Sequence, residues 1–593
     1  MRRFFYVFVV LAVVAAPPVY ADPATEAIQT PPSGTWPSFG RDYSNQRFSP
    51  LTQIDAGNVH RLVRAWTYRS GIQATFQATP IVVDRTMYLS LPFNHVVALD
   101  ARTGEERWRY VHTLMPGRTP CCGPSNRGVA VADGKVFMGT VDGRLIALDQ
   151  RSGARLWDVD VLERTPTQTE SVSRIAPDDP LAAARFVGST GAGIAMAPVV
   201  YQGKVLIGIT GVGFGLHLDS SAENPLTVVG LPGNYGRSGF LAAFDAATGA
   251  RLWTFDTVRA GAWEGDYRSH TPDGHALPRD IPGEKAAAAR YPSAWKFGGG
   301  AAWSSPAIDT RRGLLYFGTG NPSPNMEDSS RPGDNLYTTS LVALEIETGA
   351  LRWHFQQVPH DIWGYDVASP AVLFDFERDG RRIPAVAQAS KLGWLYIHDR
   401  ETGALLLKSD AFVPQHNLFQ RPTTAGLRVH PGVTGGVNWS PMALDATAGL
   451  AYVAAMHWPV IYTLHEKPAA NGRPASRYTS MDPVKDERWG VLAAIDLKTG
   501  HVRWQHRTRE PLIGGTLATA GNLVFVGEGT GELDAFDATR GTLLWQHTHD
   551  AGVNAPPITY AIDGVQYVAV VVGGNHLFGF TQGDQVAVYA LGR

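Results

Sequence analysis

The sequence predicts an all-β protein, and within that class an eight-bladed β-propeller with tryptophan-docking repeats. Three observations support this prediction: an internal repeat, the spacing of its copies, and a high content of glycine and proline. The chain has 63 glycines and 40 prolines in 593 residues, which favours many short strands and turns over long helices.

The repeat is a hairpin that ends in a large side chain. The clear copies read ALDARTGEERW, ALDQRSGARLW, AFDAATGARLW, ALEIETGALRW, AIDLKTGHVRW and AFDATRGTLLW, and they end at Trp108, Trp157, Trp253, Trp353, Trp504 and Trp545. A weaker copy, IHDRETGALLL, ends at Leu407, and VHRLVRAW, ending at Trp66, supplies an eighth strand without the turn.

Each copy contains the signals of two strands and a tight turn. Alternating apolar residues make a strand, Asp-x-x-Thr-Gly makes a turn in which glycine takes a positive φ, and the next strand ends in the aromatic residue. One such hairpin cannot bury its apolar face alone, so neighbouring copies must stack, with each tryptophan between adjacent sheets.

The spacing of the copies favours a closed ring. Most intervals are close to the size of a four-stranded blade, and the long ones hold Gly/Pro-rich inserts at 211–239 and 254–300. We expect the C-terminal strand, QVAVYAL at 585–591, to close the ring against the N-terminal strands. A stack of separate sandwich domains is the alternative, but no linker-like segment separates the copies.

The N-terminus resembles a signal peptide. Arg2 and Arg3 precede an apolar run at 4–16, and small residues suited to cleavage follow up to Ala21. A membrane anchor is the alternative, but about 13 apolar residues are fewer than the roughly 20 that span a bilayer. We therefore expect residues 1–21 to be removed, residues 22–593 to form a single propeller domain, and the protein to be periplasmic.

The charge balance argues against polyanionic partners. The formal net charge is -2, so no basic face for nucleic acid or anionic lipid is implied. A small-molecule partner is expected instead.

The only two cysteines of the chain, Cys121 and Cys122, are adjacent. Neighbouring Cα atoms lie about 3.8 Å apart, which is below the usual disulfide range of roughly 4.4 to 6.8 Å. A bond between them would close a strained eight-membered ring, and strain of this kind tends to persist where function fixes it. Two reduced thiols or an intermolecular bridge are the alternatives, although the expected compartment is oxidising.

Six motifs occur in a characteristic order along the repeats: CCGPSNRG, FGGGAAW, YFGTGNPSP, RPGDNLYTTSLVAL, PHDIW and GGTLATAGNLVF. Together they resemble the pyrroloquinoline quinone (PQQ) dependent alcohol dehydrogenases, over nearly the whole mature chain. The resemblance implies PQQ as cofactor, an alcohol as substrate and oxidation of its hydroxyl group.

The resemblance also implies a slot for the flat cofactor. A disulfide between Cys121 and Cys122 would form one wall and Trp303 the other; the alternative is that Trp303 is one more core tryptophan. The other implied cofactor contacts are Gln77, Arg127, Thr140, Thr210, Lys391, Asn438 and Trp439. Among these, Arg127 suits a carboxylate of PQQ because its planar fork makes bidentate contacts. Lys391 would stabilise negative charge beside the reactive carbonyl.

Family members bind a metal through a glutamate, an asparagine and the catalytic aspartate, and this chain departs from that pattern twice. Asn321 matches the asparagine, but Gly213 stands in the place of the glutamate and Gly364 in the place of the aspartate. Asp366, two residues later, could reach the same cavity, because alternate residues of a strand face one side. Asp361 is the other carboxylate near this turn.

Three readings of these departures remain open. The favoured one makes Asp366 both catalytic base and ligand, with Asn321, of a Ca²⁺ or lanthanide ion. In the second, the insert at 211–239 supplies a replacement carboxylate such as Asp219 or Glu223. In the third, PQQ binds with a weakened metal or none, and the chemistry is altered or lost.

We expect Asp366 to take the alcohol proton and Lys391 to assist electrostatically while hydride moves to the quinone. The chain has no Cys-x-x-Cys-His motif, so we expect an external electron acceptor such as a periplasmic cytochrome. The competing functions are a non-catalytic propeller scaffold, a PQQ-binding protein with a degraded active site, and a metal-dependent hydrolase or lyase, for which no ligand spacing was found.

Overall fold

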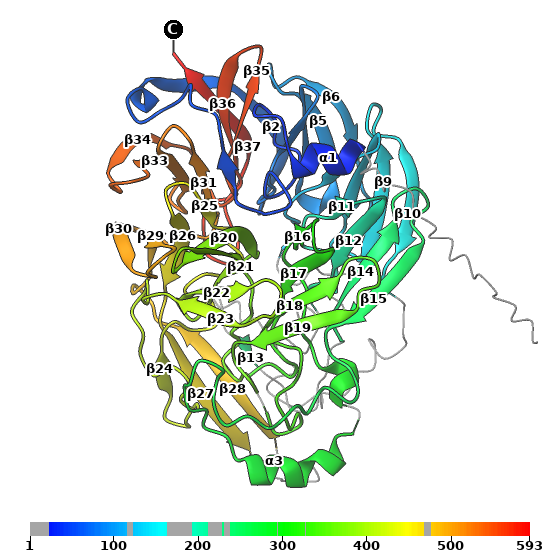
Figure 1. Cartoon of the computed structure of the whole chain (residues 1–593), viewed down its shortest axis with the longest axis vertical. Coiled ribbons are helices and arrows are strands. Elements are labelled where there is room, and N and C mark those ends of the chain that lie inside the picture. Colours follow the sequence, from blue (N-terminus) through cyan, green and yellow to red (C-terminus); the bar gives the residue numbers. More distant parts are fainter. Residues whose placement is uncertain are drawn as a thin grey trace, which may run out of the picture.

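Nearly all regular structure in the computed structural model is β-strand, arranged as four-stranded sheets around a common centre (Figure 1). The structure describes residues 23–114, 123–162, 192–211, 228–229, 238–292, 294–326, 328–467 and 476–592. These residues contain nine sheets, of which one has five strands and eight have four. The same residues contain two short α-helices, α1 (Pro23–Gln29) and α3 (Ile281–Ala287).

Eight of the sheets follow one another along the chain, and we number them in that order. Sheet 1 consists of β3 (Ile81–Val83), β4 (Thr86–Ser90), β5 (Val96–Asp100) and β6 (Glu106–Tyr110). Sheet 2 consists of β7 (Ala130–Ala132), β8 (Lys135–Gly139), β9 (Arg144–Asp149) and β10 (Arg155–Asp160). Sheet 3 consists of β11 (Val199–Tyr201), β12 (Lys204–Gly208), β14 (Phe240–Asp245) and β15 (Arg251–Asp256). Sheet 4 consists of β16 (Ala307–Asp309), β17 (Leu314–Gly318), β18 (Ser340–Glu345) and β19 (Leu351–Gln356).

The second half of the chain continues the same pattern. Sheet 5 consists of β20 (Val372–Arg378), β21 (Arg381–Ala389), β22 (Leu395–Asp399) and β23 (Leu405–Lys408). Sheet 6 consists of β25 (Ala443–Asp445), β26 (Leu450–His457), β29 (Trp489–Asp496) and β30 (Val502–Thr508). Sheet 7 consists of β31 (Thr516–Thr519), β32 (Leu523–Gly527), β33 (Glu532–Asp537) and β34 (Leu543–Thr548), with β1 (Phe48–Ser49) parallel to β31. Sheet 8 consists of β35 (Ile558–Ile562), β36 (Val565–Val572), β37 (Gly583–Leu591) and β2 (Leu62–Ala74).

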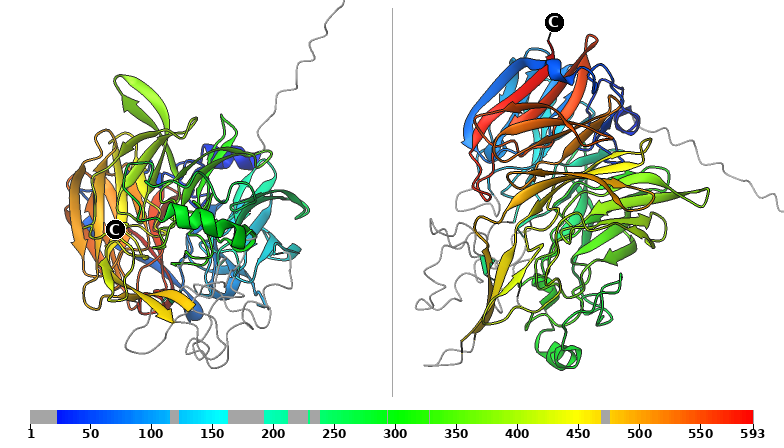
Figure 2. Two further views of the ribbon diagram at one scale, coloured as in Figure 1. Left: turned by 90° about the horizontal axis from the view of Figure 1, so that it is seen from below. Right: turned by 90° about the vertical axis from the view of Figure 1, so that its left-hand side faces the viewer.

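The ninth sheet stands outside this series, and we call it the satellite sheet. It consists of β13 (Val228–Val229), β28 (Ser476–Pro483), β27 (Val460–Lys467) and β24 (Leu427–Val429). The satellite sheet and α3 both lie at the lower end of the molecule in Figure 1, and the right-hand view of Figure 2 shows them at the same end. The repeats did not predict it, because its strands come from segments far apart in the sequence.

The Asp-x-x-Thr-Gly turns form as the sequence predicts. In sheet 1, the Asp100 carboxylate accepts the backbone N–H groups of Arg102 at 2.9 Å and of Thr103 at 3.1 Å, and Gly104 has a φ of 79°. An aspartate that bonds to the backbone two and three residues ahead stabilises the turn locally.

Tryptophans of the repeat contact the turn of the next sheet. The Trp108 indole Nε1 donates to the carbonyl oxygen of Gln150 at 3.1 Å. A Cβ atom on Gly153 of the same turn would lie 2.5 Å from the Trp108 ring, so the close approach requires glycine there. Equivalent bonds run from Trp157, Trp253, Trp353 and Trp504 to the carbonyls of Ala246, Ile346, Arg400 and Ala538.

The expected closure of the ring is confirmed. Strand β37 pairs antiparallel with β2, with Val63 opposite Ala590 and Tyr68 opposite Val586. The first long strand and the last strand of the chain therefore belong to one sheet, at the top of Figure 1.

An N-terminal segment, residues 43–49, ties the inner edges of four sheets together. Its carbonyl groups accept backbone N–H groups from the first strands of sheets 4 to 7, at distances of 2.8 to 3.1 Å: Tyr43 from Ile308, Ser44 from Leu373, Gln46 from Leu444 and Arg47 from Ala518. The Arg47 side chain is fully buried and donates to the carbonyls of Thr516, Phe39 and Pro557. Burial lowers the pKa of Arg47 to about 9, so it remains a cation at neutral pH.

Candidate functional site

The loops that lead into the first strands of successive sheets are bonded to one another. The backbone N–H of Thr79 donates to the carbonyl oxygen of Arg127 at 2.9 Å, and the backbone N–H of Arg127 donates to the carbonyl oxygen of Ala195 at 2.9 Å. Farther round, the hydroxyl of Ser305 donates to the carbonyl of Ala197 at 2.8 Å. These loops carry most of the residues that the sequence singled out, so the ring of sheets brings together residues hundreds of positions apart.

Arg127 lies against two indole rings from different sheets. Its guanidinium carbon is 4.9 Å from the centroid of the Trp303 ring and 4.8 Å from that of Trp439, and it donates to the carbonyl oxygen of Trp303 at 3.0 Å. A guanidinium at this distance from an aromatic face is attracted by the ring quadrupole. Three predicted residues therefore form one cluster, in loops that precede sheets 2, 4 and 6.

Asp366 joins this cluster to Lys391. One carboxylate oxygen accepts the Trp303 indole Nε1–H at 3.1 Å, and the other faces the Lys391 ammonium at 3.2 Å. The same ammonium donates to the carbonyl oxygen of Gly364 at 2.9 Å. Asp366 and Lys391 are 8% and 5% exposed, so this is a buried ion pair whose charges are compensated by specific hydrogen bonds.

Gly364 stands in a conformation and a space that suit only glycine. Its φ is 83°, and a Cβ atom there would lie 2.6 Å from Cγ2 of Val433. Real Cβ atoms do not approach other atoms so closely. Val433 therefore occupies the space into which a side chain at position 364 would point.

Asp361 stabilises the backbone of the same loop. Its fully buried carboxylate accepts the N–H groups of Trp363 at 3.0 Å, Gly364 at 3.1 Å and Tyr365 at 3.0 Å. Burial raises the pKa of Asp361 to about 6 despite these bonds. Asp361 thus holds the loop that carries Gly364 and Asp366, and its oxygens are occupied by that loop.

Two buried amide side chains have polar atoms without a hydrogen-bond partner among the described residues. These atoms are Nε2 of Gln77 and both Oδ1 and Nδ2 of Asn554. The sequence pointed to Gln77 but not to Asn554. Asn554 stands three residues before Pro557, as Gln77 stands before Pro80 and Trp303 before Pro306, and this shared position is the reason to consider it together with the site.

The remaining predicted residues have partners of their own. The Thr140 hydroxyl donates to Asp142 at 2.5 Å, and the backbone of Thr210 pairs with that of Gly193. The side-chain amide of Asn438 donates to the Thr434 carbonyl at 3.1 Å, and that of Asn321 to the Pro322 carbonyl at 2.8 Å.

Asn321 is near Asp366 in space. A Cβ atom on Gly320, the residue before Asn321, would lie 2.9 Å from Oδ2 of Asp366. The backbone beside Asn321 therefore adjoins Asp366, whereas the Asn321 side-chain amide bonds to Pro322.

Five residues of the sequence hypothesis lie outside the described residues: Cys121, Cys122, Gly213, Asp219 and Glu223. The described chain resumes at Gly123, where a Cβ atom would lie 3.7 Å from Thr75, two residues before Gln77. The proposed disulfide, the altered glutamate position and the substitute carboxylates remain predictions.

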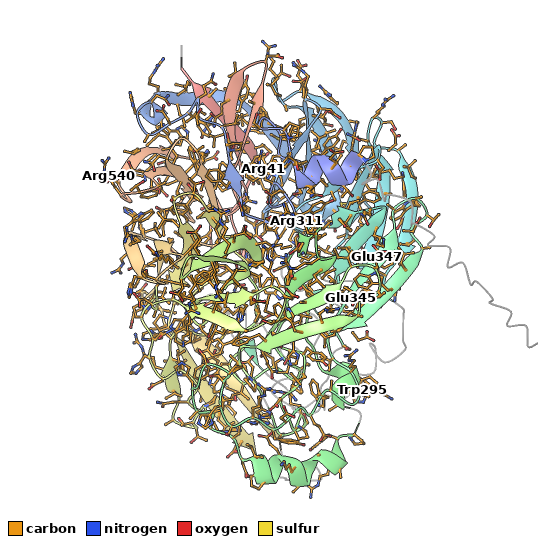
Figure 3. All side chains as sticks on the ribbon, in the orientation of Figure 1. Arg41, Trp295, Arg311, Glu345, Glu347 and Arg540 are labelled. Carbon is orange, nitrogen blue, oxygen red and sulfur yellow. The ribbon has the colours of Figure 1, made fainter. Side chains whose placement is uncertain are left out.

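A separate polar hollow of about 1230 Å³ lies against the N-terminal segment, and its lining includes Tyr43, Asp309, Arg311 and Arg400. Arg311 is labelled in Figure 3. None of its lining residues was predicted to bind a cofactor. The candidate site therefore consists of Arg127, Trp303, Trp439, Asp366 and Lys391, which we call the Trp303 cluster, and not of this hollow.

The fold and the site define a class: a β-propeller in which flat aromatic rings, two cations and one carboxylate converge from several sheets. The family model that matches is described as the beta-propeller domain of glucose, ethanol and alcohol dehydrogenases, and it covers residues 36–417 and 407–568. The chain belongs to this family of PQQ propellers.

Similar proteins include quinoproteins with and without haem in their names. The quinoprotein alcohol dehydrogenase PedH of Pseudomonas putida is 32% identical over 560 residues, which cover 90% of this chain and 85% of that protein. The quinohemoprotein alcohol dehydrogenase ADH-IIG of Pseudomonas putida is 35% identical over 583 residues, which cover 92% of this chain and 73% of that protein.

Solved structures agree. The structure of quinohemoprotein alcohol dehydrogenase ADHIIG from Pseudomonas putida HK5 matches 96% of this chain and 81% of its own, with a TM-score of 0.75 at 31% identity. A europium-containing methanol dehydrogenase matches 96% of this chain and all of its own, with a TM-score of 0.75 at 27% identity.

The described residues fit PQQ, which is flat and carries carboxylates. Indole rings can stack on a flat ring system, and Arg127 and Lys391 supply the positive charges that carboxylates require. Among the described residues, the buried Nε2 of Gln77 has no partner, and Gln77 is two residues from Thr79, whose backbone N–H donates to the Arg127 carbonyl. A buried polar atom without a partner is costly, so a ligand that bonds to it is favoured.

The described residues do not fit a metal ion in the same way. Ca²⁺ takes six to eight oxygen ligands, with carboxylates among them. Asp366 is the one carboxylate of the Trp303 cluster, and Trp303 and Lys391 already bond to its oxygens. No group of three or more histidine, cysteine, aspartate or glutamate side chains suited to a metal occurs in the described ranges. The predicted metal roles of Asn321 and Asp366 thus remain untested and lack support from the donor set.

Proposed function

We propose that the protein is a PQQ-dependent alcohol dehydrogenase that oxidises a hydroxyl compound and passes the electrons to an external acceptor. The observation that carries this proposal is the position of Asp366, held between the Trp303 indole and the Lys391 ammonium beside Arg127. The family membership and the names of the relatives support the same reaction class.

The proposal includes a fold in which residues 22–593 form a single domain, an eight-bladed propeller. Sheets 1 to 8 would be the blades, and the satellite sheet would be an accessory built from the long inserts. First strands of neighbouring sheets contact one another, as in β3 with β7, β16 with β20 and β25 with β31. The tryptophan contacts between sheets support docking of adjacent blades.

In the cofactor slot, Trp303 would form one wall and a disulfide between Cys121 and Cys122 the other. Arg127 and Lys391 would bind the anionic and carbonyl groups of PQQ, and Gln77 and Asn554 would bond to its polar edge. Thr140, Thr210, Asn438 and Trp439 would line the surroundings.

The chemistry divides between the cofactor and the chain. PQQ, held by these residues, would supply the two-electron oxidant that the oxidation of an alcohol requires. Asp366 would accept the hydroxyl proton as general base, because it is a carboxylate held in a fixed orientation by two donors. Lys391 would supply positive charge where negative charge develops during the reaction, and its two hydrogen bonds fix its position beforehand.

The cellular context is part of the proposal. The leader-like residues 1–21 support export to the periplasm, and no helix of the described chain is long and apolar enough to span a membrane. The chain has two cysteines and no Cys-x-x-Cys-His motif, so the electrons would leave to a separate acceptor such as a periplasmic cytochrome.

A second candidate is a protein that binds PQQ but has lost catalysis. The observation in its favour is Gly364, where the family resemblance places the catalytic aspartate and where Val433 fills the side-chain direction. The two candidates differ only in turnover, so one experiment separates them.

The experiment titrates the purified full chain with PQQ, alone or with Ca²⁺ or La³⁺, and follows quenching of tryptophan fluorescence. Reduction of an artificial dye is then measured over a panel of alcohols. Saturable binding with alcohol-dependent dye reduction supports the dehydrogenase. Binding without turnover supports the second candidate, and absence of binding under every condition contradicts both.

A variant pair assigns the base. Asp366→Asn should bind PQQ but lose turnover by about 10² to 10⁴-fold, the usual worth of a general base. The control Asp375→Asn removes an exposed carboxylate that pairs with Arg400 in sheet 5, and it should leave turnover unchanged. Full activity in Asp366→Asn would remove the assignment.

A further inference from the structure

We infer that the Lys391 ammonium is the resident cation of this active site, in place of a bound metal ion, so that the enzyme works without calcium or a lanthanide. This inference rests on the proposed function, because it concerns the charge that assists the same reaction. The family resemblance implies a bound Ca²⁺ or lanthanide ion, and the inference differs from that expectation.

The ammonium is held in one place by two acceptors. It is 3.2 Å from Oδ1 of Asp366 and 2.9 Å from the carbonyl oxygen of Gly364, and the Lys391 residue is 5% exposed. An ammonium group has three N–H donors, and the two acceptors found in the described part of the chain leave one donor for an incoming oxygen. A fixed cation with a remaining donor can do what a bound metal does as an electrostatic aid.

The carboxylate that would otherwise attract a metal is engaged by donors on both sides. The Trp303 indole bonds to one oxygen of Asp366 and the Lys391 ammonium to the other. A metal ion next to Asp366 would have to displace a bonded cation or lie close to it. Like charges in a buried site repel strongly, because little water screens them.

The neighbouring chain is adapted to the ammonium. At position 364 the glycine contributes its carbonyl to Lys391, while Cγ2 of Val433 occupies the space that a side chain at 364 would need. A second carboxylate at this position is thus sterically disfavoured. Val433, Gly364 and Lys391 form one arrangement in which a backbone carbonyl and a lysine replace a carboxylate and a metal.

The test compares metal-free and metal-loaded holoenzyme. The full chain is depleted of metal with a chelator and reconstituted with PQQ in chelator, with PQQ and Ca²⁺, or with PQQ and La³⁺. PQQ binding by tryptophan fluorescence, bound metal by mass spectrometry and dye-linked alcohol oxidation are measured on each sample. We expect equal PQQ affinity, no stoichiometric metal and equal activity in the three samples.

Two results would overturn the inference: activity that appears only with Ca²⁺ or La³⁺, or one equivalent of metal taken up together with PQQ. Failure of PQQ to bind in every sample would instead refute the proposed function itself. Binding of PQQ without activity in any sample would also overturn the inference, because the ammonium would then not support the reaction.

Variants at position 391 supply an independent readout. Lys391→Met should weaken PQQ binding in chelator by about tenfold or more, the worth of a hydrogen bond to a charged group, whereas Lys391→Arg keeps the charge and should bind more tightly than Lys391→Met. The control Lys204→Met breaks a lysine–carboxylate contact of 2.9 Å with the exposed Glu347, which is labelled in Figure 3. Equal PQQ affinity of Lys391→Met and Lys204→Met, with thermal unfolding confirming that both are folded, would contradict the inference.

Discussion

Restoring an aspartate at position 364 is the most direct perturbation of the rearranged loop. An L-residue in the left-handed region costs about 1–2 kcal/mol, and the φ of 83° places Gly364 there. The approach of a new Cβ atom to within 2.6 Å of Val433 Cγ2 adds an overpacking cost of about 1–3 kcal/mol. Gly364→Asp should therefore lower the free energy of unfolding by roughly 2–5 kcal/mol.

The matched control is Gly380→Asp, in the turn between β20 and β21. Gly380 has a φ of 72°, and nothing lies within 4 Å of a Cβ atom built there. This variant carries the backbone cost without the clash, so the two variants should differ by about 1–3 kcal/mol. Urea unfolding followed by tryptophan fluorescence measures both.

Adding Val433→Ala to Gly364→Asp should recover part of the loss, because it removes the atom that the new side chain meets. Equal stability of Gly364→Asp and Gly380→Asp would refute the reasoning. In that case the space beside position 364 would be open, and the glycine would not reflect an occupied site.

Other variants test the charges of the site and of sheet 7. Arg127→Met removes the cation between the Trp303 and Trp439 rings and should weaken PQQ binding by about tenfold to a hundredfold, measured by fluorescence titration; undiminished affinity would exclude Arg127 from the slot. Burial and the neighbouring Asp534 raise the pKa of Glu528 to about 9. The folded protein therefore keeps a proton that the unfolded chain releases as the pH rises above about 4.5, and Glu528 costs more stability at higher pH. The stability of Glu528→Gln relative to the unsubstituted protein should increase between about pH 5 and pH 8, measured by urea unfolding, and a constant difference would show that Glu528 is ionised in the folded state.

The ring of sheets was predictable because its signals are local. The Asp100 turn and the Trp108 contact each use residues within one hairpin or the next, and each leaves a visible pattern in the sequence. The satellite sheet and the segment at 43–49 left no such pattern. Their positions depend on pairing between parts of the chain that are far apart, which a repeat search cannot detect.

The structure brings together several residues that the motif order placed in one site, and their roles there stay predictions. Arg127, Trp303, Trp439, Asp366 and Lys391 come together as the motif order implied. Their mutual bonds, and above all the contact of Lys391 with the carbonyl of residue 364, depend on a backbone conformation that the sequence does not display.

Asp361 shows why a nearby carboxylate is a weak indicator of function. Its sequence position next to the Trp363 turn made it a plausible reserve for the missing aspartate. In the structure, the Asp361 carboxylate oxygens accept three backbone N–H groups of the loop. The sequence position of Asp361 did not reveal these hydrogen bonds. Asn554 was not singled out, although an alignment of the loops on their prolines places it at the same position as Gln77 and Trp303.

The pairing of β2 with β37 determines when the ring can be completed. Strand β2 is made early in synthesis, but its partner, Gly583–Leu591, is the last strand of the chain. Until those residues emerge, one long edge of β2 has no neighbour from β37, and exposed strand edges favour pairing with other chains. A chain shortened by its last ten residues should therefore aggregate during folding even though every residue of the cofactor slot is still present.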